Sequence, residues 1–195
     1  MDPEVSDEEL MLRYCNGDAG AFDLLYARHK GKLFRFVVRQ CRDTVLAEEL
    51  FQEIWFNLIR ARSRYQVEAK FSTYLYCLAH NRLIDYFRSQ PHVHLVSTDD
   101  EDAPEIDPPA RQNTQPEQQI ELKQQVAKFF ELLESLPVVQ KEAFLLYQEA
   151  GLSIEQIAEV TGTNKEAAKS RLRYAVAKIK TGLQEFCGAE IAAKD

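Results

Sequence analysis

The stretch that decides the fold is LSIEQIAEVTGTNKEAAKSRLRYAVAKIK, from Leu152 to Lys180. Ser153 with Gln156 three positions later is typical of a capping box at a helix N-terminus, and the apolar residues that follow keep helical spacing. Gly162 interrupts this spacing, as a glycine that can take positive φ does at a helix end. Thr163, with a glutamate three positions later, predicts a second capping box. We therefore expect two short helices joined by a tight turn.

The second helix of this pair has an apolar face and a basic face. Lys165, Lys169 and Arg173 lie four residues apart on one stripe, with Arg171 beside it. From 165 to 180, six basic residues stand against one acid, although the whole chain has a net charge of −7. A basic helix N-terminus after a tight turn favours insertion into the major groove of DNA, where cations and the helix dipole meet phosphates. A solvated basic face on an ordinary helical hairpin is the alternative.

Length and composition favour a helical protein in a reducing compartment. The 195 residues are 45% hydrophobic, enough for one domain or two small cores, and 7 glycines and 7 prolines disfavour a turn-rich β fold. The acidic N-terminus does not resemble a signal peptide, and no apolar stretch approaches the ~18–20 residues of a membrane span. We expect a cytoplasmic protein without membrane insertion. The four widely separated cysteines are expected to be small buried hydrophobes: Cys15, Cys41, Cys77 and Cys187.

Four amphipathic helices are predicted before residue 92. A suitable N-cap residue precedes each of the first three: Ser6, Asp18 and Asp43. The third helix should run to about Arg62, and residues 63–70 lose the apolar spacing and are expected to form a loop. The fourth helix should run from Phe71 to about Ser89, because Pro91 cannot continue it.

An acidic linker and a second helical domain make up the rest of the chain. Residues 93–117 are rich in acids, Pro, Gln and Thr, which predicts a flexible tether. Helical spacing returns at 120–136 and again at 138–149, before the opening motif. The predicted fold class is all-α, with two small helical domains on a flexible acidic linker. We expect a four-helix N-terminal domain, the linker, a helix-turn-helix domain and a tail: 1–92, 93–117, 118–187 and 188–195.

A second basic cluster lies between Arg60 and Arg88, where six basic residues stand against two acids. Six aromatic residues are interleaved with it: Tyr65, Phe71, Tyr74, Tyr76, Tyr86 and Phe87. Cations mixed with rings suit unpaired bases, which stack on protein rings at about 1–3 kcal/mol per base. We therefore expect this region to bind single-stranded nucleic acid. The alternative is that the rings are core residues, which fits the helical spacing of Phe71, Tyr74 and Phe87 equally well.

The third helix has an acidic face. Glu48, Glu49 and Glu53 have no basic residue among them, and Trp55 follows closely. Such a face avoids DNA and suits a basic protein partner, with Trp55 as its anchor. Three solvated glutamates near a helix N-terminus are the alternative.

In this order, the features resemble a bacterial sigma factor of the sigma-70 family, in its extracytoplasmic-function class (ECF, group 4). The resemblance spans about residues 8–187. Three motifs carry it: AEELFQEIWFNLIRAR at 47–62, FSTYLYCLAHNRLIDYFR at 71–88, and the 136–180 segment with LSIEQIA and AKSRLRYA. It implies a transcription initiation factor that binds core RNA polymerase and directs it to promoters.

The resemblance also implies roles for individual residues. The helix that docks on the polymerase β′ coiled coil would use, with the Trp55 anchor, Ala47, Glu48, Glu49, Leu50, Gln52 and Glu53. The loop that captures a flipped −10 base, and the helix after it, would use Arg64, Tyr65, Lys70, Phe71, Tyr74, Asn81, Arg82, Asp85 and Arg88. The helix that reads the −35 element, with its basic-Ser-Arg signature, would use Lys165, Lys169, Ser170, Arg171, Arg173 and Tyr174.

Partners and rival functions follow from these assignments. The partners would be the β′ coiled coil and β flap of core polymerase, double- and single-stranded promoter DNA, and an anti-sigma factor. We expect no enzyme activity, cofactor or metal, because no histidine has a nucleophile or metal-motif partner: His29, His80, His92 and His94. A stand-alone helix-turn-helix regulator is the main alternative, but it leaves the Arg60–Arg88 cluster unexplained. A protein-binding adaptor leaves both basic clusters unexplained.

Overall fold

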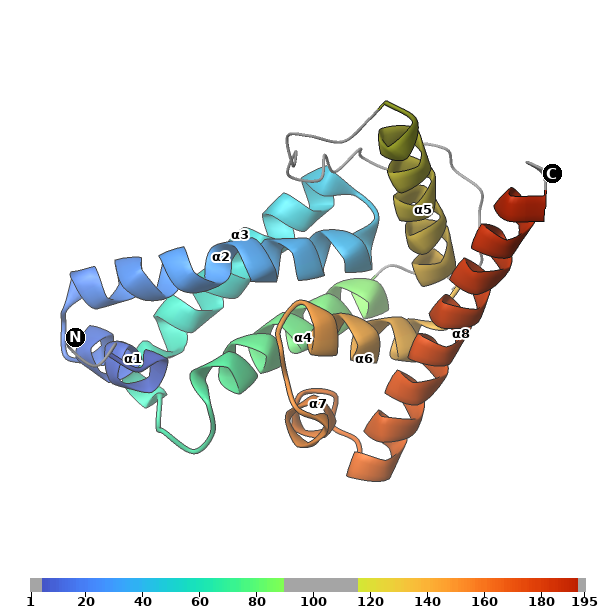
Figure 1. The fold of residues 1–195 in the computed structure, drawn as a ribbon. Coiled ribbons are helices and arrows are strands. Elements are labelled where there is room, and N and C mark those ends of the chain that lie inside the picture. The colour runs from blue at the N-terminus through green and yellow to red at the C-terminus, as the bar shows by residue number, and fades with distance from the viewer. Residues whose placement is uncertain (1–4, 90–115, 193–195) are drawn as a thin grey trace. The chain divides into compact units, whose positions relative to one another are not determined.

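The computed structural model describes the backbone of residues 5–89 and 116–192, and the side chains of 5–89 and 122–188. Every regular element in these residues is helical (Figure 1), which confirms the all-α fold class. The elements are α1 (Asp7–Cys15), α2 (Ala19–Cys41), α3 (Thr44–Ala61), the 3-10 turn η1 (Arg62–Arg64), α4 (Phe71–Ser89), α5 (Pro116–Glu134), α6 (Val138–Gln148), α7 (Ile154–Val160) and α8 (Lys165–Ala192). The predicted linker lies outside the described residues, apart from 116 and 117, with which α5 begins.

Two compact units make up the chain. The first contains residues 1–96 and 145–168, and the second contains 97–144 and 169–195. The division falls within α6 and within α8, so the first unit holds α1 to α4, the end of α6, and α7. These units follow the packing of the chain, whereas the expected domain boundaries follow sequence motifs. Those boundaries therefore stay a prediction.

The N-terminal helices begin where the capping residues predict. The side chains of Ser6, Asp18 and Asp43 accept hydrogen bonds from the backbone N–H groups three positions later. These bonds satisfy donors that have no partner inside the helix. The predicted loop is confirmed from residue 65 to residue 70, because η1 continues the turn of α3 through Arg64. The fourth helix has the bounds expected for it, Phe71–Ser89.

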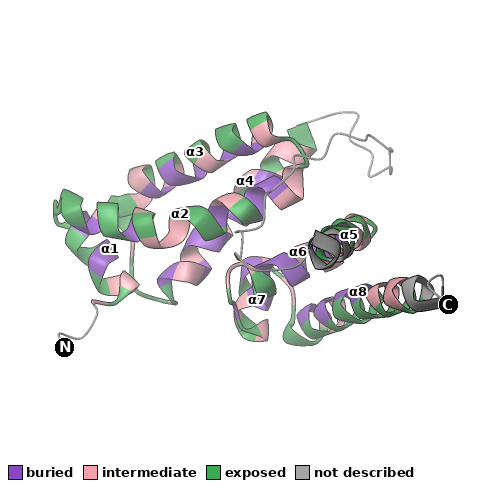
Figure 2. Ribbon diagram, turned by 45° about the horizontal axis from the view of Figure 1, so that its top comes forward, coloured by how far each residue is buried: buried purple, intermediate pink, exposed green. Residues whose placement is uncertain are grey.

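The core of the first unit lies between α1, α2, α3 and α4. Each of these helices has a buried and an exposed side (Figure 2). The largest fully buried side chains of this core are Leu10, Met11, Leu25, Leu33, Phe36, Leu50, Ile54, Leu58, Phe71, Leu75 and Tyr76. Full burial of one such side chain contributes roughly 1.5–3 kcal/mol, so the packing of these faces holds the four helices together.

The turn between α7 and α8 confirms one predicted cap and corrects the other. Ser153 and Gln156 form the expected capping box of α7, and Gly162 has a positive φ of 60°. Thr163 does not cap α8. Instead the Oδ1 atom of Asn164 accepts a hydrogen bond of 2.8 Å from the N–H of Ala167. Asparagine is as good an N-cap as serine, and it lies one position nearer the helix, so α8 begins one residue later than a Thr163 cap requires.

The second unit is built on α5 and α8. A Cβ atom at Gly182 would overlap the side chain of Leu132, so the glycine lets the two helices approach closely. The Nζ atom of Lys178 donates a hydrogen bond of 2.6 Å to the carbonyl oxygen of Ser135, at the end of α5. The last helix continues to Ala192, so the predicted tail from residue 188 begins inside a helix.

Candidate nucleic-acid interface

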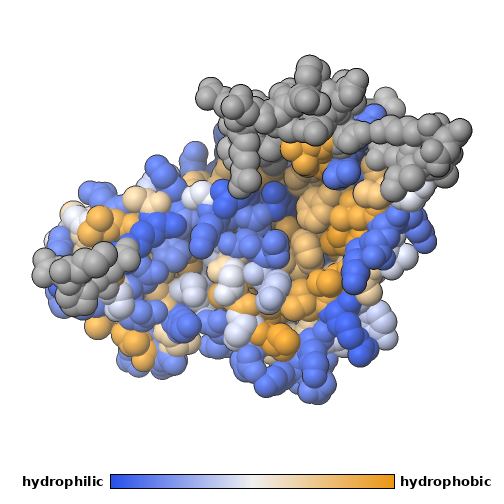
Figure 3. Space-filling view, viewed as in Figure 1, coloured by the Kyte–Doolittle hydropathy of each residue, from blue (hydrophilic) through white to orange (hydrophobic). Residues whose placement is uncertain are grey.

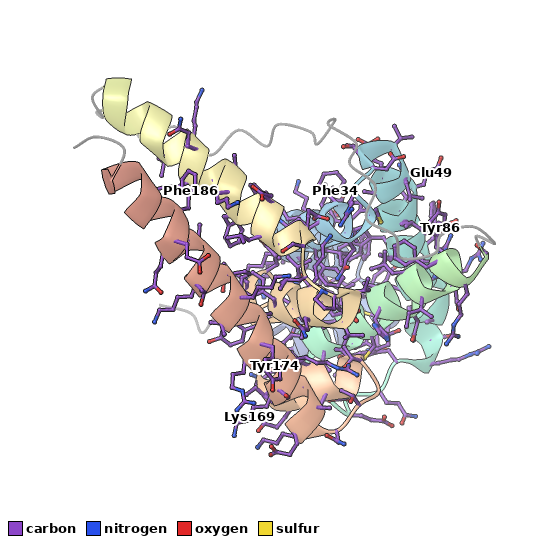
Figure 4. All side chains as sticks on the ribbon, turned by 90° about the vertical axis from the view of Figure 1, so that its right-hand side faces the viewer. Phe34, Glu49, Tyr86, Lys169, Tyr174 and Phe186 are labelled. Atoms are coloured by element: carbon purple, nitrogen blue, oxygen red, sulfur yellow. The ribbon has the colours of Figure 1, made fainter. Side chains whose placement is uncertain are left out.

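The acidic face of α3 combines an exposed stripe with a buried one. Glu48, Glu49, Gln52 and Glu53 are exposed, and Glu49 is labelled in Figure 4. Two predicted contact residues face inward instead: Ala47 is 0% exposed and Leu50 is 1% exposed. The apolar members of the motif therefore hold α3 against the core, and the charged members are available to a partner.

The prediction that Trp55 anchors a partner is wrong, because its side chain is 5% exposed. Its indole ring packs against Phe22, Tyr26 and Phe51, with ring centroids 5.7, 5.0 and 6.3 Å away. Phe56, the next residue, is 58% exposed and was missed. Helical spacing from Ile54 and Leu58 could have assigned the two rings, since Trp55 shares their face and Phe56 does not.

The start of α4 is held by a contact that the sequence did not predict. The backbone N–H of Phe71 donates a hydrogen bond of 2.7 Å to Oε1 of Glu8, a residue of α1. The Phe71 ring is 0% exposed and lies 5.1 Å from the ring of His29. Phe71 is therefore a core residue, and its prediction as a DNA contact is wrong. Helical spacing alone is compatible with either a core position or a DNA contact for Phe71.

Tyr65 and Tyr74 form a half-buried aromatic pair beside the loop. Their ring centroids are 5.1 Å apart, nearly edge to face. Burial, followed by the nearby charge of Glu8, raises the pKa of Tyr65 to about 12. Its hydroxyl has no hydrogen-bond partner among the described side chains. We call this pair the aromatic ledge. Its rings are partly accessible, and the exposed cations Arg64 and Lys70 flank Tyr65 and Tyr74 in sequence.

Two cations near the loop are engaged by protein groups. The guanidinium of Arg62 lies 5.3 Å from the centre of the Tyr14 ring. Arg82 of α4 forms an ion pair with Glu53 of α3, and its guanidinium also lies 6.0 Å from the Tyr86 ring. The sequence placed Arg82 and Glu53 in two separate sites, but the structure brings them together. Three further predicted contacts on α4 are exposed: Asn81, Asp85 and Arg88.

The basic start of α8 contains one engaged cation and several accessible ones. Lys165 forms an ion pair with Glu155 of α7, whose hydrogen bond with Lys165 lowers the pKa of Glu155 to about 2. Lys169 and Tyr174, labelled in Figure 4, are exposed, as is Arg173, whose guanidinium lies 5.2 Å from the Tyr174 ring. The other two predicted contacts are half-buried: Ser170 and Arg171.

An apolar hollow of 410 Å³ lies in the second unit along α8. It is lined by Phe144, Val176, Ile179, Lys180, Leu183, Gln184 and Cys187. Figure 3 shows apolar residues gathered along this side of α8. Exposed apolar surface in a concave place is typical of a protein-docking site. The sequence does not reveal this hollow, because the same apolar stripe also builds the core.

Possible metal ligands and thiols are scattered over the part of the chain that the structure describes. It contains no group of three or more His, Cys, Asp or Glu residues placed to hold a metal ion. His92 and His94 lie outside it. The four cysteines are free thiols and are half-buried, so the expectation of small buried hydrophobes is met only in part. None of the described helices combines the length and apolar character that a membrane span requires.

Two family models match the chain, in the order that the motifs predict. Residues 25–92 match sigma-70 region 2, and residues 127–179 match sigma-70 region 4. The first match contains the acidic face, the aromatic ledge and α4, and the second contains the capping box and the basic start of α8.

Relatives cover nearly the whole chain. RNA polymerase sigma factor CarQ of Myxococcus xanthus is 29% identical over 183 residues, which are 90% of this chain and 97% of CarQ. The ECF RNA polymerase sigma factor SigK of Mycobacterium sp. strain KMS is 28% identical over 92% of each chain. The fold matches that of the sigma factor RpoE of Bartonella quintana, solved with the anti-sigma factor NepR, with a TM-score of 0.65 at 18% identity, over 84% of this chain and 96% of RpoE.

These matches do not favour a stand-alone regulator, because such a protein would need only the helix-turn-helix, whereas region 2 is also present. The order of motifs, the all-helical fold and relatives matched over nearly their full length agree with one another. The chain belongs to the sigma-70 family of RNA polymerase sigma factors, in its extracytoplasmic-function class, and directs the polymerase to promoters.

Proposed function

We propose that this sigma factor binds core RNA polymerase through the exposed stripe of α3 and recognises promoter DNA with two separate surfaces. The observation that carries this proposal is the contrast in charge between two motifs. The α3 stripe presents Glu48, Glu49 and Gln52 to solvent, whereas the start of α8 presents Lys169 and Arg173. An anionic stripe repels phosphates and attracts a basic protein surface, and a cationic helix start does the reverse.

The −10 surface combines the aromatic ledge with the cations around it. Tyr65 and Tyr74 offer ring faces and edges on which an unstacked base can pack, and Arg64 and Lys70 attract the phosphates of the displaced strand. This surface gains binding energy only when bases have left the duplex. Binding therefore favours the melted promoter over the paired one.

The −35 surface is the first part of α8. The exposed Lys169 and Arg173 suit phosphate contacts, and we assign base-edge contacts in the major groove to the half-buried Ser170 and Arg171. Lys165 forms an exposed ion pair with Glu155 across the turn between the two helices, and it must exchange this partner for a phosphate to contact DNA.

Two protein partners beyond the β′ coiled coil complete the proposal. The apolar hollow along α8 fits an apolar helix, and we assign it to the β flap of core polymerase. RpoE, which shares the fold, was solved in complex with an anti-sigma factor, and we propose such a regulator for this chain too. The protein would act by binding alone, in the cytoplasm, where polymerase and DNA are found.

Run-off transcription with core polymerase on genomic fragments tests the proposal. The wild-type protein should produce discrete transcripts that core polymerase alone does not. Glu49→Lys should weaken core binding about tenfold or more, because a reversed charge at the centre of a charged interface costs roughly 1.4 kcal/mol or more.

The matched control reverses a charge at Asp23, which is exposed on α2 outside the motif. Asp23→Lys should leave core affinity unchanged. Equal core affinities for the wild type and Glu49→Lys would remove α3 from the polymerase interface, and no transcript from any fragment would argue against the function as a whole.

A further inference from the structure

Helix α1 contacts the loop that carries the proposed −10 surface at both of its ends. At the end of the loop, Oε1 of Glu8 accepts a hydrogen bond of 2.7 Å from the backbone N–H of Phe71, the first residue of α4. At its start, the Sγ atom of Cys15 donates a hydrogen bond of 2.9 Å to the carbonyl oxygen of Arg62, the first residue of η1. The loop of residues 65–70 therefore lies between two anchors on one helix. Both anchors come before residue 25, outside the two family matches.

Helix α1 is a fixed spacer between these two anchors. Glu8 and Cys15 are seven positions apart, so they share one face of the helix and lie about 10.5 Å apart along its axis. The helix is itself held in the core of the first unit, where Met11 is 0% exposed. Asp7 adds an ion pair of 2.6 Å with Arg28 of α2. The distance that the loop must span is therefore set by α1 rather than by the loop.

Glu8 provides a helix cap that the chain next to α4 lacks. The carbonyl oxygen of Lys70 accepts the first hydrogen bond of α4, from the N–H of Tyr74, so Lys70 holds the N-cap position. A lysine side chain has donors only, and cannot accept from the N–H groups that have no partner at the start of a helix. The carboxylate of Glu8 accepts from one of them instead, and its charge suits the positive end of the helix dipole. Glu8 thereby fixes the turn that contains Tyr74.

Cys15 acts on the other ring of the aromatic ledge. The carbonyl oxygen of Arg62 accepts a hydrogen bond from the Cys15 thiol and a second one, of 3.2 Å, from the backbone N–H of Tyr65. The Cys15 anchor thus holds the turn that carries Tyr65. Residues 66–68 are exposed, so the two ends of the loop decide its course. Burial is the main cause of the raised pKa of Tyr65, and the nearby Glu8 and Cys15 side chains contribute to it, which agrees with their position beside the ledge.

We propose that Glu8 and Cys15 are positioning residues for −10 recognition, because together they set the separation of the two rings, Tyr65 and Tyr74, that would pack against an unstacked base. This inference rests on the proposed function, since the ledge matters to transcription only if it binds a base. Neither anchor contacts DNA, and each acts through the backbone of the loop or of α4. Loss of an anchor should therefore weaken the binding of single-stranded −10 DNA, while core binding is retained.

A single-stranded oligonucleotide tests the role of Glu8. Its sequence is the non-template −10 strand of a promoter that the wild-type protein opens, and its affinity is measured for the full-length protein bound to core polymerase. Glu8→Ala removes the acceptor and should weaken oligonucleotide binding about five- to tenfold, the effect of losing a helix cap. Glu8→Gln keeps an oxygen that can accept from the same N–H, and should stay within about twofold of the wild type.

Cys15 is tested in the same assay. Cys15→Ala removes the weak thiol donor and should lower the affinity about twofold, whereas Cys15→Ser keeps a donor and should bind as the wild type does. Glu9→Ala is the matched control, because Glu9 is the neighbouring acid in the first turn of α1 and pairs with Arg13 of the same helix. It should leave oligonucleotide binding unchanged. All of these variants should bind core polymerase as tightly as the wild type.

Amide hydrogen exchange in the protein alone measures the Glu8 anchor without DNA or polymerase. Glu8→Ala should speed up exchange at the start of α4 about five- to tenfold and leave exchange in α3 unchanged. Wild-type exchange in this variant would overturn the anchor. An equal loss of core and oligonucleotide affinity would overturn the positioning role, because it would show a role in folding only.

Two further outcomes separate this inference from the proposed function. Faster exchange with unchanged oligonucleotide affinity, or a Glu8→Gln variant that binds no better than Glu8→Ala, would overturn the positioning role of Glu8. A wild-type protein that starts no transcript would overturn the proposed function, and exchange in the protein alone would still decide whether α1 anchors the start of α4.

Discussion

The cations of the two proposed DNA-binding surfaces differ in how far other protein groups engage them. Around the loop before α4, Arg62 lies on the Tyr14 ring and Arg82 is paired with Glu53. At the start of α8, Lys169 and Arg171 have no ion-pair partner among the side chains that the structure describes. The same residue type thus has two uses. In the first region part of the positive charge holds the surface together, whereas of the described cations in α8 only Lys165 is ion-paired, with Glu155, and Lys169 and Arg171 are available to phosphates and bases.

The aromatic residues of the two surfaces also differ, in how far they are buried. Near the loop, Phe71 is fully buried and Tyr65 and Tyr74 are half-buried, so rings build the surface and also offer part of it to a ligand. On α8, Tyr174 is 55% exposed and touches only the neighbouring Arg173 among the ring contacts of the described residues. Changes near the loop should therefore alter stability and function together, and changes at the start of α8 should alter function alone.

Among the substitutions that test this difference between the two surfaces, Arg171→Ala is expected to have the largest effect. If Arg171 reads a base edge, its loss should weaken promoter binding by polymerase carrying this sigma factor by about 1–3 kcal/mol, roughly tenfold to a hundredfold. Core affinity and the unfolding free energy should not change by more than about 0.5 kcal/mol, since the residue has no ion pair to lose. Filter binding and chemical unfolding measure the two quantities.

The matched control is Lys123→Ala, a loss of one exposed cation on α5. It should leave both promoter binding and stability as in the wild type. A large drop in stability for Arg171→Ala would break the comparison, because it would show that Arg171, like Lys165, serves the structure of α8.

A smaller effect is expected at the Glu53 and Arg82 pair. The two side chains are 49% and 24% exposed, so solvent screens their interaction and each single charge reversal should cost about 0.5–1 kcal/mol of unfolding free energy. The double swap, Glu53→Arg with Arg82→Glu, should recover most of that stability. Promoter opening should stay impaired in the swap, because the cation has moved from α4 to α3. Full recovery of promoter opening would show that Arg82 serves the fold only.

Helix positions followed from the sequence because their signals are local. N-cap residues, Gly162 and the apolar spacing all act within a few residues, and the structure has α1 to α4 and α7 where these signals predict them. The cap of α8 was missed because Thr163 and Asn164 are both good N-caps, and only the backbone path decides between them.

Contacts between helices could not be predicted in the same way. The partners Glu8 and Phe71 are 63 positions apart in the chain, and Gln156 and Thr73 are 83 apart. Nothing local distinguishes Glu8 from the two acids beside it, since which one reaches α4 depends on how α1 packs. Likewise the choice between Trp55 and Phe56 as the exposed ring depends on which face of α3 meets α2. The sequence therefore predicted which types of residue form these surfaces, but not which side chain each of them contacts.

The smallest effect is expected from Tyr65→Phe, and it depends on pH. The folded protein raises the pKa of Tyr65 from 10.0 to about 12, first through burial, so folding favours the neutral phenol. That contribution to stability is complete below pH 10 and is lost as the pH rises from about 10 to about 12. The wild type should therefore lose stability relative to Tyr65→Phe over that interval.

At neutral pH the two proteins should agree within about 1 kcal/mol, because the hydroxyl has no hydrogen-bond partner among the described side chains. The single tryptophan, buried at Trp55, reports unfolding in both proteins. Promoter opening at neutral pH should be unchanged, since phenylalanine keeps the ring on which a base would stack. A loss of opening with no loss of stability would mean that the hydroxyl itself binds DNA. Tyr65 would then resemble the free side chains of α8 more than the structural residues around the loop.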